Sequence, residues 1–291
     1  MLSPDFFFEK SLWKRGFKTV GGSDEVGRGC FAGPVVAGCV VFDCRLSIHR
    51  CISSDIKIDD SKRLTPKQRE IADKWIRENA LAWGIGAISV ANINRLGLAK
   101  STEMAFRMAI RNANLMLEKK NKDRIGYLLI DAFYIPYVRD IRMPNKQART
   151  KSPQFSRKGS KSLFTASLHP WNKISRFSRS LNKNAKIKYQ KSKLNKTTVL
   201  NGKQLAIVKG DEKSFSIASA SIIAKVYRDK MMISLSGQYK FKKYNWGKNK
   251  GYGTKEHRSA ILEHGSTKYH RSQFVQTYFS NFYSSQARSS V

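Results

Sequence analysis

The sequence predicts an α/β protein, because short apolar segments of strand length alternate with longer segments of helical periodicity. At 291 residues the chain is long enough to bury a full core in one or two domains. Acidic residues stand at the ends of several strand-like segments, and open α/β sheets form their sites at the carboxyl ends of strands. These observations predict a layered fold and the end of the sheet at which its chemistry takes place.

The first two strand-like segments are expected to pair as a hairpin. Residues 35–42 are apolar throughout, which is typical of a buried strand, and residues 18–24 are the expected partner. Residues 83–90, 127–131 and 204–208 are the other predicted strands.

Two adjacent carboxylates, Asp24 and Glu25, lie where the first strand is expected to end. Neighbouring side chains on a strand point to opposite faces, so both can meet one metal ion only if the strand stops there. Gly27 and Gly29 supply that ending and let the main chain approach a ligand, while Arg28 can grip phosphate with its forked guanidinium. The alternative is a strand edge followed by a solvated turn.

A predicted helix begins after the run from Asp60 to Leu64. Thr65 is a typical N-cap, Pro66 occupies the first helical position and Gln68 completes a capping box. The apolar side of this helix is expected to consist of Ile71, Ala72, Trp75 and Ile76.

Three more helices are predicted, at residues 99–117, 216–229 and 255–264, the last closed by Gly265. A polar tail rich in aromatic residues follows from Phe274. The core residues expected in the first of these helices are Met104, Ala105, Met108, Ala109, Leu115 and Met116.

The charge balance is strongly basic, with 55 Lys and Arg against 21 Asp and Glu, a formal net charge of +34. Such a field attracts polyanions, so nucleic acid or an anionic membrane surface is the expected partner. No apolar segment approaches the roughly 20 residues needed to span a bilayer. The first ten residues carry acidic side chains and no apolar core with a cleavage site, so neither a secretory signal nor a transit peptide is expected.

The cysteines Cys30, Cys39, Cys44 and Cys51 lie close together in the sequence, with His49 among them. Since no pair has Cys-x-x-Cys spacing, free buried thiols are favoured over a zinc site. We therefore expect a reducing intracellular compartment, the cytoplasm or an organelle.

A basic segment interrupts the second half of the chain. Residues 141–210 contain no Asp or Glu and 18 Lys and Arg, which leaves +16 for the rest of the chain. Within them, residues 145–200 have few periodic apolar positions and cannot offset their ordering entropy, so we expect a flexible basic insertion. An arm that binds polyanions and a tolerated loop of drifting composition are both open interpretations.

Four carboxylates stand in similar contexts at strand ends: Asp24, Glu25, Asp131 and Asp211. Gathered together, they would form a strongly negative site that folding disfavours unless divalent cations fill it. Carboxylate oxygens favour Mg²⁺ or Mn²⁺ over zinc, and two such ions stabilise the attacking and leaving oxygens in phosphodiester hydrolysis. An acidic centre inside a basic chain therefore predicts a nuclease. For each aspartate alone, a cap or turn residue is the alternative.

Several runs of residues, in chain order, resemble the motifs of ribonuclease HII. They are Ser23-Asp24-Glu25-Val26-Gly27-Arg28-Gly29, Asp60-Ser61-Lys62, Leu129-Ile130-Asp131, Lys209-Gly210-Asp211 and the run from Ala220 to Asp229. The runs from Gly251 to His257 and from His270 to Phe274 extend the resemblance, which covers most of the chain except the insertion.

The resemblance implies a ribonuclease H-like mixed β-sheet flanked by helices, in one catalytic domain over residues 1–291 with a C-terminal helical extension at about 235–291. It implies metal-dependent hydrolysis of the RNA strand of RNA–DNA hybrids and incision at ribonucleotides embedded in duplex DNA, as in DNA replication and repair. The products would carry 5′-phosphate and 3′-hydroxyl ends. The implied partners are these nucleic acids, with no membrane and no obligate protein partner, for a monomer.

The same resemblance implies residue roles. Asp24, Glu25, Asp131 and Asp211 would bind two Mg²⁺ or Mn²⁺ ions. The main chain of Gly27, Arg28 and Gly29 would sense the ribose 2′-hydroxyl, Tyr252 would contact the next deoxyribose, and Lys62 with Arg63 would hold backbone phosphate.

Some residues depart from the family pattern or compete for a role. Cys30 stands where the family usually has proline, and the insertion lengthens the gap between Asp131 and Asp211. Asp229 is the second choice for the fourth carboxylate, because an ion pair with the adjacent Arg228 would explain it. The histidines His257, His264 and His270 are expected to be structural.

Two other functions are weighed against an active nuclease. A non-catalytic RNA- or hybrid-binding protein would need only the positive charge, and loss of an acidic residue would favour it. A resolvase or integrase would use the acidic centre but need not sense a 2′-hydroxyl. Ribonuclease HIII is less favoured because the residues before Asp24 leave no room for its extra N-terminal domain.

Overall fold

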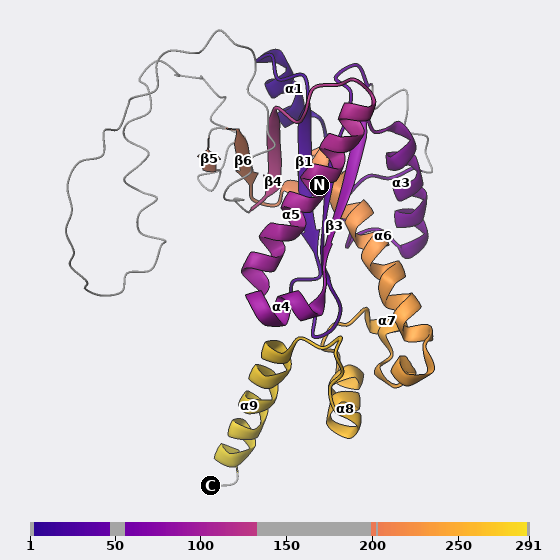
Figure 1. The fold of residues 1–291 in the computed structure, drawn as a ribbon, viewed down its shortest axis with the longest axis vertical. Coiled ribbons are helices and arrows are strands. Elements are labelled where there is room, and N and C mark those ends of the chain that lie inside the picture. Colours follow the sequence, from indigo (N-terminus) through magenta and orange to yellow (C-terminus); the bar gives the residue numbers. More distant parts are fainter. Residues whose placement is uncertain (1–2, 47–55, 133–198, 202, 290–291) are drawn as a thin grey trace, which may run out of the picture. The chain divides into compact units, whose positions relative to one another are not determined.

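A six-stranded mixed β-sheet forms the centre of the fold, with strand order β3-β2-β1-β4-β6-β5 (Figure 1). The computed structural model describes residues 3–46, 56–132, 199–201 and 203–289, all of which belong to one unit of the chain. The strands are β1 (Val20–Val26), β2 (Val35–Val41), β3 (Ala82–Ile88), β4 (Tyr127–Asp131), β5 (Val199–Asn201) and β6 (Gln204–Ile207). Because β1, β4 and β6 run parallel, their carboxyl ends meet at the same end of the sheet.

The predicted strands are confirmed, with shifts of a few residues at their ends. The first two pair antiparallel as expected, with Ser23 opposite Cys39. β5 was not predicted, since its three residues overlap the end of the expected insertion at 145–200. The rest of that insertion lies outside the described residues.

Helices cover both faces of the sheet. They are α1 (Phe7–Lys14), α3 (Pro66–Asn79), α4 (Val90–Leu96), α5 (Leu98–Lys119), α6 (Phe215–Gly237), α7 (Trp246–Asn249), α8 (Lys255–His264) and α9 (Ser272–Ser289), with 3₁₀ turns η4 (Gly210–Glu212) and η5 (Tyr239–Tyr244). Within the described part of the chain, no helix is both long and apolar enough to cross a membrane.

Successive side chains of β2 point to opposite faces of the sheet and so belong to two different layers of the core. Ala37 and Cys39 pack in a cluster with residues of α5, whereas Val40 packs with residues of α6 and α3. In Figure 1, α5 crosses in front of the sheet and α6 lies behind it. At Gly86 a Cβ atom would collide with the main chain of α5, and at Gly38 it would collide with α6, so both helices lie close against the strands.

The predicted start of α3 is confirmed in detail. The Thr65 hydroxyl accepts a hydrogen bond from the Gln68 main-chain N–H, and the Gln68 side chain accepts one from the Thr65 N–H. The expected burial of Ile71 is wrong, because this side chain lies outside the arc formed by the buried residues Ala72 and Ile76 and is exposed.

The long helix α5 is confirmed, but two of its expected core residues are wrong. Ala105 and Ala109 are fully buried, and Met104 and Met116 pack against the core. Met108 and Leu115 are exposed. The buried stripe instead includes Ala105, Ala109 and Ala113, and Met108 and Leu115 lie outside it.

The C-terminal elements form their own small core. Trp246 is buried among the side chains of Phe241, Tyr244 and Met232, and the predicted α8 ends at Gly265 with a φ of 74°. The tail predicted from Phe274 is helical, as α9.

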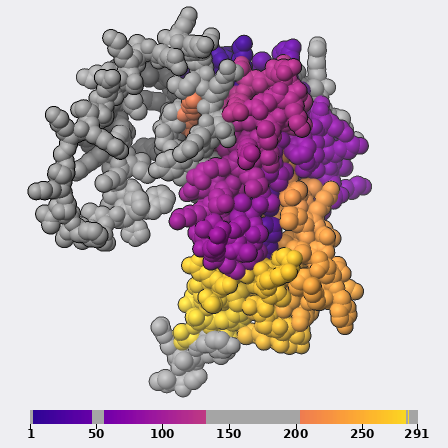
Figure 2. All heavy atoms as spheres, viewed as in Figure 1, coloured from indigo at the N-terminus to yellow at the C-terminus, as the bar shows by residue number. Residues whose placement is uncertain are grey.

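This C-terminal part, yellow in Figure 2, lies against the purple surface to which α4 belongs. The Asn94 side chain donates a hydrogen bond to the His270 carbonyl and accepts one from the Ser272 N–H. Asn94 thus joins the two parts of the molecule, as does Arg271, which donates to the Gly33 carbonyl.

The described cysteines are free thiols. Cys30 and Cys39 are buried as expected, whereas the expected burial of Cys44 is wrong because it lies in an exposed turn after β2. Cys51 and His49 lie outside the described residues.

Candidate active site

The four predicted metal ligands stand at the carboxyl ends of β1, β4 and β6, and we refer to them as the acidic edge: Asp24, Glu25, Asp131 and Asp211. β1 continues in register with β2 to Val26, two residues beyond the predicted end at Asp24, and Gly27 follows with a φ of +91° that favours glycine. Asp131 is the last residue of β4, and Asp211 lies in η4 directly after β6. Parallel pairing of these strands therefore brings together residues that are far apart in the sequence.

The raised pKa values of these carboxylates indicate that they lie close enough for their charges to repel one another. Burial raises the pKa of Asp24 well above its usual range, and the charges of Glu25, Asp131 and Asp211 raise it further. Burial likewise raises the pKa of Asp211, and the charges of Asp131 and Asp60 add to this effect. The insertion between Asp131 and Asp211 has not separated them.

A main-chain hydrogen bond ties two of the acids together. The Gly210 N–H donates to Asp131 Oδ1 at 2.7 Å, immediately before Asp211 in the chain. Burial raises the pKa of Asp131, and this hydrogen bond opposes the effect because it stabilises the ionised form.

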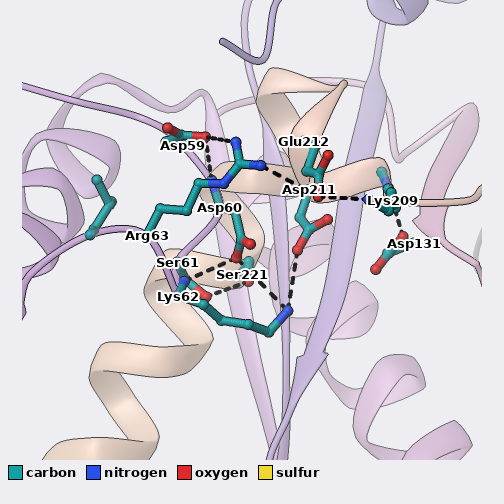
Figure 3. Close-up of polar contacts among 12 residues, drawn as sticks. Asp59, Asp60, Ser61, Lys62, Arg63, Asp131, Lys209, Asp211, Glu212 and Ser221 are labelled. Atoms are coloured by element: carbon teal, nitrogen blue, oxygen red, sulfur yellow. Dashed lines mark hydrogen bonds and ion pairs between the residues drawn. The ribbon is translucent and has the colours of Figure 1, made fainter. Parts of the chain in front are cut away.

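The Lys62 ammonium group lies at the acidic edge (Figure 3). Its Nζ is 3.6 Å from Asp211 Oδ2 and 3.8 Å from Asp60 Oδ1. Partial burial lowers the pKa of Lys62, but the charges of Asp60, Asp211 and Asp24 outweigh it, so the pKa is raised. The predicted phosphate ligand thus acts as counterion to the carboxylates, and Asp60 is a fifth acid that sequence reasoning did not assign to the site.

Two buried serines support Asp24 and were also missed. The hydroxyls of Ser61 and Ser221 are 3.0 Å apart, and a hydrogen bond from Ser221 lowers the pKa of Asp24. Since a hydroxyl has one proton, Ser221 donates to Asp24 and Ser61 donates to Ser221. The close repetition of Ser in the predicted helix at 216–229 was the available signal.

Arg63 is engaged with acids beside the acidic edge. Its guanidinium is 3.6 Å from Asp59 Oδ1 and 3.7 Å from Glu212 Oε1. In this structure Arg63 therefore connects the loop before α3 to η4, on which Asp211 lies.

The residues predicted to read the substrate lie side by side. Cys30 and Tyr252 form an antiparallel bridge, which sets the Tyr252 loop next to the turn of Gly27, Arg28 and Gly29. Tyr252 is exposed, and the Arg28 guanidinium donates a hydrogen bond to Glu25 Oε1 at 3.2 Å. The turn thus adjoins the acidic edge on one side and the Tyr252 loop on the other.

The expected ion pair between Asp229 and Arg228 is wrong. Consecutive residues on a helix point about 100° apart, so the two side chains diverge. Asp229 pairs with Lys225 at 2.9 Å and with Arg69 at 3.9 Å. The Arg228 guanidinium donates instead to three main-chain carbonyls, those of Ala32, Pro34 and Lys250.

The donor set fits a hard divalent cation, although the side chains are not gathered around one point. Among the described residues, no three acidic, His or Cys side chains converge closely enough to hold an ion. The carboxylates nevertheless repel one another and have raised pKa values, so a divalent cation would relieve this repulsion through oxygen ligands that Mg²⁺ and Mn²⁺ prefer. Lys62, beside Asp211, and Arg28, beside Glu25, now partly offset this charge.

A mixed sheet with acidic side chains at the ends of its parallel strands, inside a chain of net charge +34, defines a nuclease of the ribonuclease H-like class. The comparisons with known proteins specify the family. The sequence model of "Ribonuclease HII" matches residues 21–161 and 176–282. A ribonuclease HII of Wolbachia pipientis is 34% identical over 275 residues, which are 94% of this chain and 98% of that protein.

The chain therefore belongs to the ribonuclease HII family. It is a ribonuclease H, an endonuclease that degrades the RNA of RNA–DNA hybrids, and divalent-metal dependence is typical of this family.

Two solved structures confirm the predicted fold class. Ribonuclease H2 from Pyrococcus horikoshii aligns with a TM-score of 0.50 and 21% identity, over 91% of this chain and 98% of that one. Bst-RNase HIII in complex with Mn²⁺ aligns with a TM-score of 0.50 and 15% identity, over 91% of this chain and 70% of that one.

Proposed function

We propose that this ribonuclease H also incises duplex DNA at single embedded ribonucleotides, and that it leaves 5′-phosphate and 3′-hydroxyl ends. The observation that carries the proposal is the placement of the glycine-rich turn from Gly27 to Gly29 between the acidic edge and the exposed ring of Tyr252. A 2′-hydroxyl is the group that separates RNA from DNA, and a glycine main chain can approach it closely.

The acidic edge would hold two Mg²⁺ or Mn²⁺ ions. Bound there, the ions would supply charge stabilisation to the attacking and leaving oxygens of the phosphodiester. Asp24 and Asp131 are held by hydrogen bonds from Ser221 and Gly210, so their carboxylates are oriented before any ion arrives. The Bst-RNase HIII complex with Mn²⁺ supports a hard divalent cation on this fold.

Basic side chains beside the acids would hold the phosphate backbone. Lys62 is mostly exposed and can turn from Asp211 toward a phosphate once metal ions balance the carboxylates. Arg28 is also half-exposed beside Glu25, so it can contact the backbone next to the ribonucleotide.

The chain as a whole is proposed to be one catalytic domain with a C-terminal helical extension, acting as a monomer in the cytoplasm. A single chain supplies all the proposed ligands, and free thiols at Cys30 and Cys39 suit a reducing compartment. Residues 145–200 are proposed to act as an arm that binds nucleic acid through positive charge.

One experiment tests the proposal directly. The purified protein is incubated with a DNA duplex that contains one ribonucleotide and with the all-DNA duplex of the same sequence, each with Mg²⁺, with Mn²⁺ and with EDTA. We expect cleavage only at the ribonucleotide and only with a divalent cation. Cleavage of a uniform RNA–DNA hybrid without cleavage of the single-ribonucleotide duplex would refute the proposal while leaving the family activity intact.

A further inference from the structure

Two buried histidines lie directly behind the Tyr252 loop and take no part in the proposed chemistry. His257 on α8 and His270 before α9 are almost fully buried, and their Nε2 atoms are 3.1 Å apart. The Trp246 indole N–H donates to His257 Nε2 at 3.0 Å. On the other side of its ring, His257 Nδ1 is 2.8 Å from the Tyr252 carbonyl oxygen.

The fixed donors around these rings determine where the protons lie. The Thr267 main-chain N–H can only donate, so His270 Nδ1 at 2.8 Å accepts and His270 carries its proton on Nε2. That Nε2–H donates to His257 Nε2, which also accepts from Trp246. His257 therefore carries its proton on Nδ1 and donates it to the Tyr252 carbonyl.

This chain of hydrogen bonds connects to the main chain of Tyr252 and of the glycine turn, the residues proposed to contact the substrate. The Tyr252 carbonyl accepts from the Thr254 N–H as well, so the His257 donor is one of two that hold this carbonyl. At the other end, His270 bridges to Ala32 in the segment that follows the glycine turn. The neighbouring Arg271 guanidinium donates to the Arg28 carbonyl at 2.8 Å.

We propose that His257 and His270 are positioning residues that hold Tyr252 at a fixed distance from the turn of Gly27 to Gly29, and thereby set the preference for a ribonucleotide followed by DNA. This inference rests on the proposed role of Tyr252 in the function above. It assigns the two histidines no contact with substrate.

Their surroundings suit a neutral pair. The rings that face the imidazoles belong to Phe31, Tyr244 and Trp246. Burial lowers the pKa of both histidines, and for His270 the proximity of His257 adds to this effect. A proton added to His257 Nε2 would face two donors, and one added to His270 Nδ1 would face the Thr267 N–H, so protonation of either ring breaks the chain.

Two substitutions at one position separate positioning from stability. In His257→Gln, the side-chain amide can keep an acceptor near the place of Nε2 for Trp246, but it loses the donor to the Tyr252 carbonyl. In His257→Asn, the shorter amide can keep that donor near the place of Nδ1, but it loses the acceptor for Trp246 and His270. The His264→Gln variant on the same helix is the control, because its ring is outside the chain of hydrogen bonds.

The readout is the ratio of kcat/KM for a single-ribonucleotide duplex to that for a uniform RNA–DNA hybrid, measured together with the thermal unfolding midpoint. We expect His257→Gln to lower the ratio about fivefold with little change in the midpoint, as for loss of one hydrogen bond that holds a loop. We expect His257→Asn to lower the midpoint but keep the ratio. A ratio that follows the midpoint in both variants would overturn the proposal, as would an unchanged ratio in His257→Gln.

A spectroscopic measurement tests the proton positions without activity. Long-range ¹H–¹⁵N spectra of ¹⁵N-histidine protein at pH 7 should show His257 protonated on Nδ1 and His270 on Nε2. The reverse assignment, or a doubly protonated ring, would refute the hydrogen-bond chain. If the wild-type protein does not cleave the single-ribonucleotide duplex, the role of Tyr252 fails while the tautomer result still stands.

Discussion

The acidic edge and the region behind the Tyr252 loop hold buried polar groups in opposite ways. At the acidic edge, carboxylates of like charge lie near one another and the pKa values of Asp24, Asp131 and Asp211 are raised. Behind the loop lie the neutral histidines His257 and His270 and the buried arginines Arg228 and Arg271. Each nitrogen of their imidazole and guanidinium groups has a hydrogen-bond partner. The first region stores repulsion for a cation to relieve, and the second is saturated and therefore rigid.

The largest expected effect comes from removing one carboxylate of the acidic edge. Asp24→Asn should lower the cleavage rate by at least on the order of a thousandfold, because a buried ligand of the proposed metal site is lost. Binding of the hybrid should persist, which fluorescence anisotropy would measure. The control is Glu78→Gln, an exposed acid on α3 that should leave the rate unchanged. Full activity of Asp24→Asn with Mg²⁺ or Mn²⁺ would disprove the site assignment.

The next effect tests the saturated region. Arg271→Met should lower the free energy of unfolding by about 3 kcal/mol, because the carbonyls of Arg28 and Gly33 lose buried donors. Chemical denaturation would measure this, with Arg45→Met, at a mostly exposed pair, as the control. A loss no larger than that of the control would show that these carbonyls are satisfied without Arg271.

The contributions of the two regions to stability should change in opposite directions as the pH falls. The pKa of His270 is lowered to about 4, so its contribution to stability is complete above pH 6.5 and is lost as the pH falls toward 4. This loss amounts to about 2 to 3 kcal/mol. The pKa of Asp24 is raised by burial and by the neighbouring carboxylates, so its protonation on acidification relieves both costs and stability is gained.

Unfolding free energies at pH 7 and pH 4.5 would separate these terms. Relative to the wild type, Asp24→Asn should lose more stability over this interval, because it lacks the carboxylate that gains from protonation. The same slope in both proteins would mean that the pKa of Asp24 is not raised in the folded protein.

The smallest expected effect concerns the basic insertion. Deletion of residues 145–196 leaves β5 in the chain, and every charged residue that it removes is Lys or Arg. The affinity for the hybrid should therefore fall several-fold at low salt and little at high salt. Titrations over a range of salt concentrations would measure this. An equal loss of affinity at every salt concentration would argue against an electrostatic arm.

The elements and the chain order of the acids could be predicted from the sequence because each depends on local signals. A capping box fixes the start of α3, and short apolar runs mark β4 and β6. What the sequence could not show depends on tertiary geometry. Arg228 and Asp229 are adjacent in the chain yet diverge, and Ser61 meets Ser221 across a long separation.

Helix faces were predicted less well, for a related reason. Met108 and Leu115 are apolar but exposed, because they lie outside the buried face of α5, which contains the large residues Phe106, Ile110 and Leu117 as well as small ones. Apolar character alone therefore does not identify the side of α5 that faces the core. The ion pairs of Lys62 with Asp60 and Asp211 were likewise not predicted from the sequence, since only the folded loop brings these residues together.

The direct ladder between β4 and β6 has a practical consequence. Both ends of the intervening segment are fixed by main-chain pairing, so extra residues there add only the entropy of closing a longer loop, about 0.6 kcal/mol for each doubling of length. A fluorescent protein or a second binding module spliced into this position would consequently leave the ladder intact, and its attachment point would follow Asp131, one of the proposed metal ligands.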